Sequence, residues 1–303
     1  MNGRTLMSRI ALTCLLGGWA VGLVGPAPHA SAAPDWKMVE QALGKAGTLL
    51  AGGVYRVGFP RADLSVTVQG IRVEPAFALG SYAAFKPMGD AAMVMGDLVL
   101  LDAEVAPVMA RLLQGGLNVT AVHNHLNEMS PHVMYMHYGG HGDAVRLATA
   151  LHDALSISGT PFTSPAGAAA GTSSFDPKQI EAIMGRSGTF LNPRVFQIGV
   201  PRAETITEGG EELPPAMGVA MPFNFQDLGD GKAAITGDFV LIASEVNPVA
   251  RTLRANGIEV TALHNHTLGD EPRLFYMHFW AHDDALKLAR GLRAALDLTN
   301  SRK

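Results

Sequence analysis

The stretch Val119-Thr120-Ala121-Val122-His123-Asn124-His125 determines how this chain of 303 residues is built, because it occurs twice. The second copy, Val260-Thr261-Ala262-Leu263-His264-Asn265-His266, lies 141 residues later. Another segment, Tyr135-Met136-His137, returns at the same spacing as Tyr276-Met277-His278. Two segments repeated at one fixed offset indicate the duplication of a whole structural unit.

The duplication covers almost all of the chain after its first 32 residues. An amphipathic helix capped by Asp35 is expected over 35–46, and its counterpart, capped by Asp176, over 176–187. Residues 158–174 are rich in Ser, Gly, Ala, Thr and Pro, which is linker composition. The sequence therefore predicts a signal peptide at 1–32, repeat 1 at 33–157, a linker at 158–174 and repeat 2 at 175–303.

The first 32 residues have the pattern of a secretory signal. Arg4 and Arg9 precede an apolar run over 10–24, and Ala30-Ser31-Ala32 offers a small-residue cleavage site. Glycines and prolines interrupt the run, which favours cleavage over retention as an anchor. We therefore expect an exported protein, periplasmic or secreted, with no stable membrane span after signal cleavage.

Cysteine content and charge exclude several classes of protein. The single cysteine, Cys14, lies inside the apolar run in a poor lipobox, so lipid anchoring is not expected. The mature chain then has no cysteine, which excludes disulfides and thiolate metal ligands. Loss of two arginines and no acids would move the formal net charge from −4 to −6. A mildly acidic chain without a basic run is not expected to bind nucleic acid.

Each copy reads as strand, helix, strand, strand and helix. The first strand, 98–101 or 239–242, leads to a helix with Gly116 or Gly257 past its end. The His-Asn-His strand, the Tyr-Met-His strand and a helix starting near Asp143 or Asp284 follow. This order is that of a split βαβ unit. The predicted fold class is α+β, with two homologous repeats, each a mixed antiparallel sheet containing a ferredoxin-like βαββα segment.

Eight of the ten histidines outside the signal belong to two matched sets with the spacing H-x-H-x(11)-H-x(3)-H. Alternate residues of a strand share a face, so Val119, Ala121, His123 and His125 should project together, and a neighbouring strand should add a third histidine. The fourth is expected at the mouth of the next helix, where the helix dipole favours neutral imidazole. The expected metal ligands are His123, His125, His137 and His141 in repeat 1, and His264, His266, His278 and His282 in repeat 2.

We expect these imidazoles to gather in a pocket within each repeat, and the sequence leaves open whether the two copies share one site. An all-histidine set suits Zn first, and also Cu or Ni, whereas a carboxylate would bring Mn or Fe into range. The alternative is that the histidines are polar residues of a sheet face, satisfied by water or by carboxylates.

Other repeated residues could complete a site. Glu104 and Glu245 are candidate general bases or ligands, and equally acids that stabilise a helix start. Tyr135 and Tyr276 share the histidine face and are candidates for contact with a bound ligand. Two further pairs have structural predictions: turn formation for Asp97 and Asp238, and a structural role for Asn124 and Asn265.

The paired His-Asn-His and Tyr-Met-His segments resemble the LppY/LpqO family of exported bacterial proteins over residues 35–298. The resemblance implies an envelope or secreted location and a duplicated domain of unknown function. It supplies no activity and no catalytic residues. Founding members look like lipoproteins, and the poor lipobox at Cys14 departs from that pattern.

Three functions fit these features. The first is a metal-dependent hydrolase, in which the ion keeps one position open for water and Glu104, Glu245 or a histidine moves protons. The second is a non-catalytic envelope protein that binds a metal or small ligand. The third is a metal-free histidine acid-base enzyme resembling a phosphoesterase. The expected partners are a metal ion and an unknown small molecule.

Overall fold

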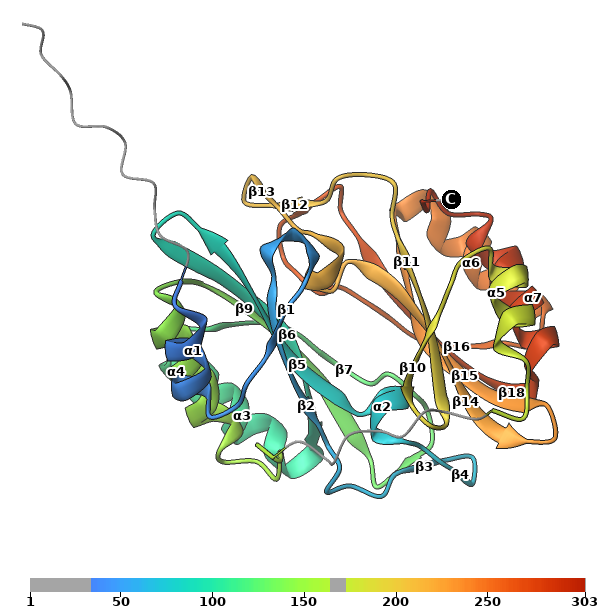
Figure 1. Cartoon of the computed structure of the whole chain (residues 1–303), viewed down its shortest axis with the longest axis horizontal. Helices are drawn as coiled ribbons and strands as arrows, with labels where there is room; N and C mark the ends of the chain where they lie inside the picture. Colours follow the sequence, from blue (N-terminus) through green and yellow to red (C-terminus); the bar gives the residue numbers. More distant parts are fainter. Residues whose placement is uncertain (1–33, 164–172, 303) are drawn as a thin grey trace, which may run out of the picture. The chain divides into compact units, whose positions relative to one another are not determined.

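Each repeat folds into a six-stranded antiparallel sheet with helices on one face (Figure 1). The structure, a computed structural model, describes residues 34–163 and 173–302. The predicted signal peptide at 1–32 and the middle of the predicted linker lie outside the described residues. The predicted α+β class with two homologous repeats is confirmed by the two matching strand orders.

Repeat 1 contains a sheet with the strand order β1-β2-β5-β6-β9-β7. Its strands are β1 (Thr48–Leu49), β2 (Tyr55–Pro60), β5 (Gly80–Met88), β6 (Ala91–Leu101), β9 (Val133–Gly142) and β7 (Asn118–His123). The helices are α1 (Trp36–Leu43), α2 (Pro75–Ala78), α3 (Asp102–Gln114) and α4 (Ala144–Leu155), with a 3-10 turn, η1 (Ala51–Gly53). A small three-stranded sheet consists of β4 (Ile71–Arg72), β3 (Thr67–Val68) and β8 (Met129–Ser130).

Repeat 2 reproduces this order as β10-β11-β14-β15-β18-β16. Its strands are β10 (Thr189–Asn192), β11 (Val195–Pro201), β14 (Ala220–Gly229), β15 (Lys232–Leu241), β18 (Phe275–Asp284) and β16 (Glu259–His264). The helices are α5 (Pro177–Met184), α6 (Ala243–Ala255) and α7 (Ala285–Leu296), with a 3-10 turn, η2 (Pro215–Met217). Its small sheet consists of β13 (Glu211–Glu212), β12 (Thr207–Glu208) and β17 (Asp270–Glu271).

The split βαβ unit forms as its sequence order predicts. In repeat 1, β9 lies between β6 and β7 and is antiparallel to both. β6 and β7 are therefore parallel to each other and are joined through α3, with α4 following β9. Repeat 2 has the same arrangement in β15, β18 and β16. This topology places the Tyr-Met-His strand inside the sheet and the His-Asn-His strand at its edge.

The first helix of each repeat begins at the predicted cap and ends earlier than predicted. The Asp35 carboxylate accepts from the Lys37 backbone N–H at 3.0 Å, and Asp176 caps Lys178 in the same way at 2.9 Å. Gly44 takes a left-handed conformation with φ of 75° and ends α1 at residue 43 rather than 46. A left-handed residue cannot continue a right-handed helix, and glycine adopts this conformation without steric cost.

The two repeats share a core, so they are not independent domains. Along β6, Ala92 and Val94 pack in the core under the helices of repeat 1. Met93 and Met95 point to the opposite face and pack in a core that is made mainly by repeat 2. Alternation along one strand thus buries both faces of the sheet, one under helices and one against the other repeat. Both repeats accordingly belong to one compact unit.

No helix among the residues that the structure describes is long and apolar enough to cross a membrane.

Candidate metal centre

The two His-Asn-His segments lie side by side where the repeats meet. The Thr120 hydroxyl of β7 donates to the His266 carbonyl oxygen of repeat 2 at 2.5 Å. The equivalent Thr261 hydroxyl of β16 donates to the His125 carbonyl oxygen of repeat 1, also at 2.5 Å. Because each hydrogen bond has its counterpart in the other repeat, the two edges are related by an approximate twofold arrangement.

The asparagines between the histidines strengthen this junction. The Asn124 side-chain amide donates to the Thr261 carbonyl oxygen at 3.3 Å, and the Asn265 amide donates to the Thr120 carbonyl oxygen at 3.0 Å. These contacts agree with the structural role that was predicted for both asparagines. They hold the flanking histidines of the two repeats against one another.

A β-bulge in the edge strand corrects one prediction about its faces. In β7, Val119 pairs with Tyr138 and Ala121 pairs with His137, with an irregular register between them. The bulge adds one residue to the edge strand, so the residues before it switch to the opposite face of the sheet. Val119 is therefore partly buried against the core under the helices instead of sharing the face of His123.

Six histidine rings from both repeats form one histidine cluster at this junction. Each ring of repeat 1 lies against a ring of repeat 2, with centroid separations of 3.4 Å for His123 and His264, 3.6 Å for His125 and His278, and 3.9 Å for the tilted pair His137 and His266. The prediction of a separate pocket within each repeat is therefore wrong. The cause is the shared face of the two sheets, which the sequence does not reveal.

Two tyrosines close opposite ends of the histidine cluster. The Tyr135 ring lies 3.3 Å from the His125 ring, and the Tyr276 ring lies 3.4 Å from the His266 ring, measured between centroids. The Tyr135 hydroxyl donates to the Ala78 carbonyl oxygen at 2.7 Å. Burial raises the pKa of both hydroxyls well above the usual value. Tyr135 therefore contributes ring packing. Its hydroxyl proton is already donated to Ala78 and is not available to a bound ligand.

Backbone carbonyls fix the tautomer of five of the six imidazoles. A carbonyl oxygen only accepts, so a ring nitrogen that hydrogen-bonds to it must carry the proton. The Nδ1 atoms in question are those of His123 with Asn124 O (2.9 Å), His137 with Gly96 O (3.4 Å), His264 with Asn265 O (3.1 Å), His266 with Gly218 O (3.2 Å) and His278 with Gly237 O (3.0 Å). Each of these rings keeps a free lone pair on Nε2.

The Nε2 atoms of all six clustered histidines are buried and have no hydrogen-bond partner among the described residues. Buried polar atoms are paired in more than about 90% of cases, and each exception calls for an explanation. These atoms could hold a metal ion, since Nε2 coordination with Nδ1–H held by a carbonyl is the usual geometry of a histidine ligand.

Five of the six clustered histidines are neutral near pH 7. Burial, followed by the nearby His278 ring, lowers the pKa of His123 to about 4. Burial also lowers the pKa values of His125, His137, His264 and His266 well below the usual range. Low pKa values keep these lone pairs available to a cation.

Two groups of side chains have the spacing of a metal site. The ligand atoms of His123, His125, His137 and His264 lie within 4.8 Å of one another, and so do those of Asp238, His264 and His266. The first group takes three histidines from repeat 1 and one from repeat 2. Because His264 belongs to both groups, the two groups cannot be filled independently.

Asp97 and Asp238 are strand residues, so their prediction as turn formers is wrong. Asp97 pairs with His137 across β6 and β9, and Asp238 pairs with His278 across β15 and β18. The nearest oxygen of Asp238 lies 2.9 Å from the Nδ1 of His278. Burial, together with the charge of Asp238, raises the pKa of Asp97 well above its usual value. The recurrence of Gly-Asp in both copies was a signal that could have identified these carboxylates.

The structure does not bring His141 and His282 into the histidine cluster. Both lie near the ends of strands, not on a helix, and both are exposed. His141 shares the sheet face of His137 but lies four residues further along β9. At 3.2–3.4 Å per residue this separation is roughly 13 Å, which is too long for one ion.

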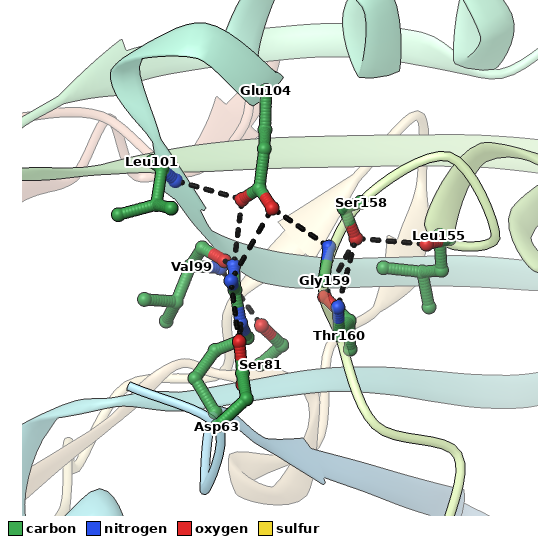
Figure 2. A network of polar contacts seen from close by, with 10 residues as sticks. Asp63, Ser81, Val99, Leu101, Glu104, Leu155, Ser158, Gly159 and Thr160 are labelled. Atoms are coloured by element: carbon green, nitrogen blue, oxygen red, sulfur yellow. Dashed lines mark hydrogen bonds and ion pairs between the residues drawn. The ribbon is translucent and has the colours of Figure 1, made fainter. Parts of the chain in front are cut away.

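Glu104 and Glu245 lie in buried ion-pair networks and not in the histidine cluster. The Glu104 carboxylate accepts from Arg61 at 2.8 Å, from the Leu101 N–H at 2.8 Å and from the Gly159 N–H at 2.7 Å (Figure 2). Burial alone would raise the pKa of Glu104, but these hydrogen bonds lower it below its usual value. A carboxylate with these partners at a helix start is a structural group, so the proposed catalytic role of Glu104 is not supported.

The equivalent network in repeat 2 repeats this arrangement. Glu245 accepts from Arg202 at 2.6 Å, from the Ile242 N–H at 3.0 Å and from the Asn300 N–H at 2.8 Å. Both arginines come from a Pro-Arg-Ala segment that occurs in each copy, and neither is more than 2% exposed. The repeated segment was visible in the sequence, but its burial was not.

A family model described as a Domain of Unknown Function (DUF1259) matches residues 37–157 and 178–298. The chain belongs to this family. The two DUF1259 matches coincide with the two repeats and leave out the whole of the predicted linker. No curated protein matches the chain. A trimeric bacterial microcompartment shell protein, PduB, has a solved structure with a TM-score of 0.22 and 11% sequence identity over 84% of this chain and 89% of that chain. A likeness this weak does not bear on function.

The metal-free DUF1259 protein is expected to lose stability as the pH falls through 6.5. Five clustered histidines have folded-state pKa values below the unfolded value of 6.5, that of His123 being about 4. Between these pKa values the unfolded chain binds protons that the folded chain does not. The free energy of unfolding therefore falls by about 1.4 kcal/mol per such proton for each pH unit. Asp97, whose pKa is raised, acts in the opposite direction but is one group against five.

Urea unfolding of chelator-treated protein at pH 7.5, 6.0 and 5.0 tests this expectation. The unfolding free energy should fall with each step. An unchanged value across this range would show that the histidines are solvated or already paired.

Proposed function

We propose that this DUF1259 protein is an exported metal-binding protein that holds one transition-metal ion, zinc in the first place, in the histidine cluster. The observation that carries the proposal is the set of six buried Nε2 atoms without hydrogen-bond partners, five of them with the tautomer that leaves Nε2 free. Export is supported by the signal pattern at 1–32 and by the resemblance to the LppY/LpqO family.

The choice of ion follows from the donor atoms. Neutral imidazoles make up the whole of the first group, His123, His125, His137 and His264. Four imidazoles suit zinc, and also copper or nickel. The second group combines Asp238 with two histidines, which is the composition that iron and manganese sites use. Zinc is proposed because the imidazoles outnumber the carboxylates.

A shared ion would connect the repeats. Ligands from both copies must be in place before the coordination is complete, so binding should favour the folded state and the docked arrangement of the sheets. At a free ion concentration of 1,000 times Kd, this linkage contributes about 4 kcal/mol to stability.

Hydrolase activity is a second candidate, favoured by the cavities beside the histidine cluster. One cavity, of about 240 Å³, reaches His125 and His278, and another, of about 310 Å³, reaches His266. A ligand in either cavity would lie beside the proposed ion, which could polarise it or activate water. Asp97 and Asp238 replace Glu104 and Glu245 as the candidates for moving a proton, because they border these cavities.

Metal-free acid-base catalysis fits less well. An acid-base pair of histidines needs one imidazolium, and the pKa values of five clustered rings are lowered by burial.

Elemental analysis of untagged protein, isolated from the exported fraction of its natural host, tests the proposal. We expect one zinc ion per chain, retained through dialysis against magnesium and removed by a strong chelator. Rebinding of zinc should raise the midpoint of thermal unfolding. Protein with no transition metal, and no zinc uptake after dialysis, would refute the proposal. Two ions per chain would refute the shared site, and recovery only from the cytoplasm would refute export.

A further inference from the structure

The two cavities beside the histidine cluster meet at one pair of side chains. Arg56 of β2 and Tyr82 of β5 line both cavities. The Arg56 guanidinium carbon lies 3.6 Å from the centre of the Tyr82 ring, a cation-π contact that orients the charged group. Arg56 also donates to the Ala216 carbonyl oxygen at 2.8 Å. The guanidinium is therefore held in place at the junction of the repeats.

This pair breaks the symmetry of the duplication. Strand pairing makes Gln197 the counterpart of Arg56 and Pro222 the counterpart of Tyr82. All four residues line both cavities, but only repeat 1 supplies a charge and an aromatic ring. The histidine cluster is symmetric, whereas the space beside it is not. Such a space can orient a ligand that has two different ends.

The charges around the cavities make ligand binding depend on the ion. Among the described lining residues, Arg56 is the one lysine or arginine, and Asp97 and Asp238 are the acids. The lining therefore holds two acidic side chains and one basic side chain, and a divalent ion would add two positive charges beside Arg56. An anion should therefore bind more strongly when the ion is in place.

We propose that the space between the sheets binds a small anion, a carboxylate or a phosphate, with one oxygen on the metal ion and the others against Arg56. This inference rests on the proposed function and names its ligand class. The planar guanidinium offers paired N–H donors that match two oxygens of such an anion. Gln197 and Asn224, which are hydrogen-bonded to each other at 2.8 Å, supply uncharged polar groups on the other side of the same space.

Titration calorimetry with inorganic phosphate and, separately, acetate tests this proposal on the full chain. The zinc-loaded protein should bind one of the two anions, and the chelator-treated protein should bind neither. Arg56→Gln should weaken anion binding at least tenfold without changing the zinc content. Arg56→Lys, which keeps the charge and loses the paired donors, should show a smaller loss. Arg111→Gln, on the last turn of α3, is the matched control and should bind as the wild type does.

The outcomes separate this inference from the proposed function. Zinc-loaded Arg56→Gln protein that binds the anions as tightly as the wild type would overturn the anion site and leave the metal site intact. Equal binding to loaded and chelator-treated protein would also overturn it. Failure of the wild type to take up any ion would overturn both. Thermal unfolding of each variant shows whether it is folded, and Arg56→Lys still decides the question if Arg56→Gln is not.

Discussion

Replacing His137 with alanine is expected to abolish metal retention, whereas replacing His141 leaves it unchanged. His137 is 2% exposed, lies against His266 and belongs to the group of four histidines with metal-site spacing. His141 is exposed near the end of the same strand. Loss of one of four ligands from a zinc site should weaken binding by a factor of at least 100, because even a residue that only orients a ligand contributes 10- to 100-fold.

The second repeat offers the same comparison. His264→Ala should reduce zinc retention, since His264 belongs to both groups with metal-site spacing, and His282→Ala should not. Ion content after dialysis and competition with a chromogenic chelator measure both effects. Equal losses in His137→Ala and His141→Ala would mean that the ligand set is that of the sequence pattern and not the histidine cluster. Retention of the ion in the His123→Ala, His264→Ala double variant would exclude the cluster altogether.

Replacing Arg61 with methionine is expected to destabilise the fold by about 3–5 kcal/mol, since it removes one partner of a buried ion pair. Arg61 is fully buried and contacts Glu104 at 2.8 Å, Asp63 at 2.9 Å and the Val99 carbonyl oxygen at 2.7 Å. Without the guanidinium, the Glu104 carboxylate keeps only backbone donors. Urea unfolding with the ion removed measures the change.

Two controls define what the Arg61 network does. Lys178→Ala removes a salt bridge to Glu181 on the surface, and no measurable change is expected because solvent screens such pairs. Glu104→Gln should lower stability while leaving zinc content intact, since Glu104 lies outside the histidine cluster. Loss of zinc in a folded Glu104→Gln protein would restore Glu104 as a ligand. An Arg61→Met protein as stable as the wild type would show that the network is solvated.

Local signals in the sequence predicted the order of the elements well. The Asp35 and Asp176 caps, the split βαβ order and the duplication all depend on short segments or on direct comparison of the copies. Asp97 was misassigned because Gly-Asp favours turns locally, whereas its burial depends on a strand and a repeat that lie far away in the sequence. His141 was misassigned because alternation along the strand shows only which face of the sheet a residue occupies. It does not show how far that residue lies from the other ligands.

Six of the eight predicted histidines form the histidine cluster, but its location between the repeats was not predicted. Sequence spacing identified His123, His125 and His137 as residues of one face, and the structure agrees. This face meets its copy in repeat 2 because Met93 and Met95 pack into the core that is made mainly by repeat 2. No pattern within a single repeat contains this information.

The reciprocal hydrogen bonds between Thr120 and Thr261 and the opposite histidine segments have a consequence for the origin of the molecule. A single ancestral copy would have reached the same arrangement only by meeting a second chain, at a cost set by the dilution of the free chains. Covalent fusion replaces that encounter with a tethered one, at an effective concentration on the order of millimolar for a short flexible tether. Fusion also frees each half to change alone, and the divergence of Arg56 from Gln197 is a change that an identical pair could never have made on one side only.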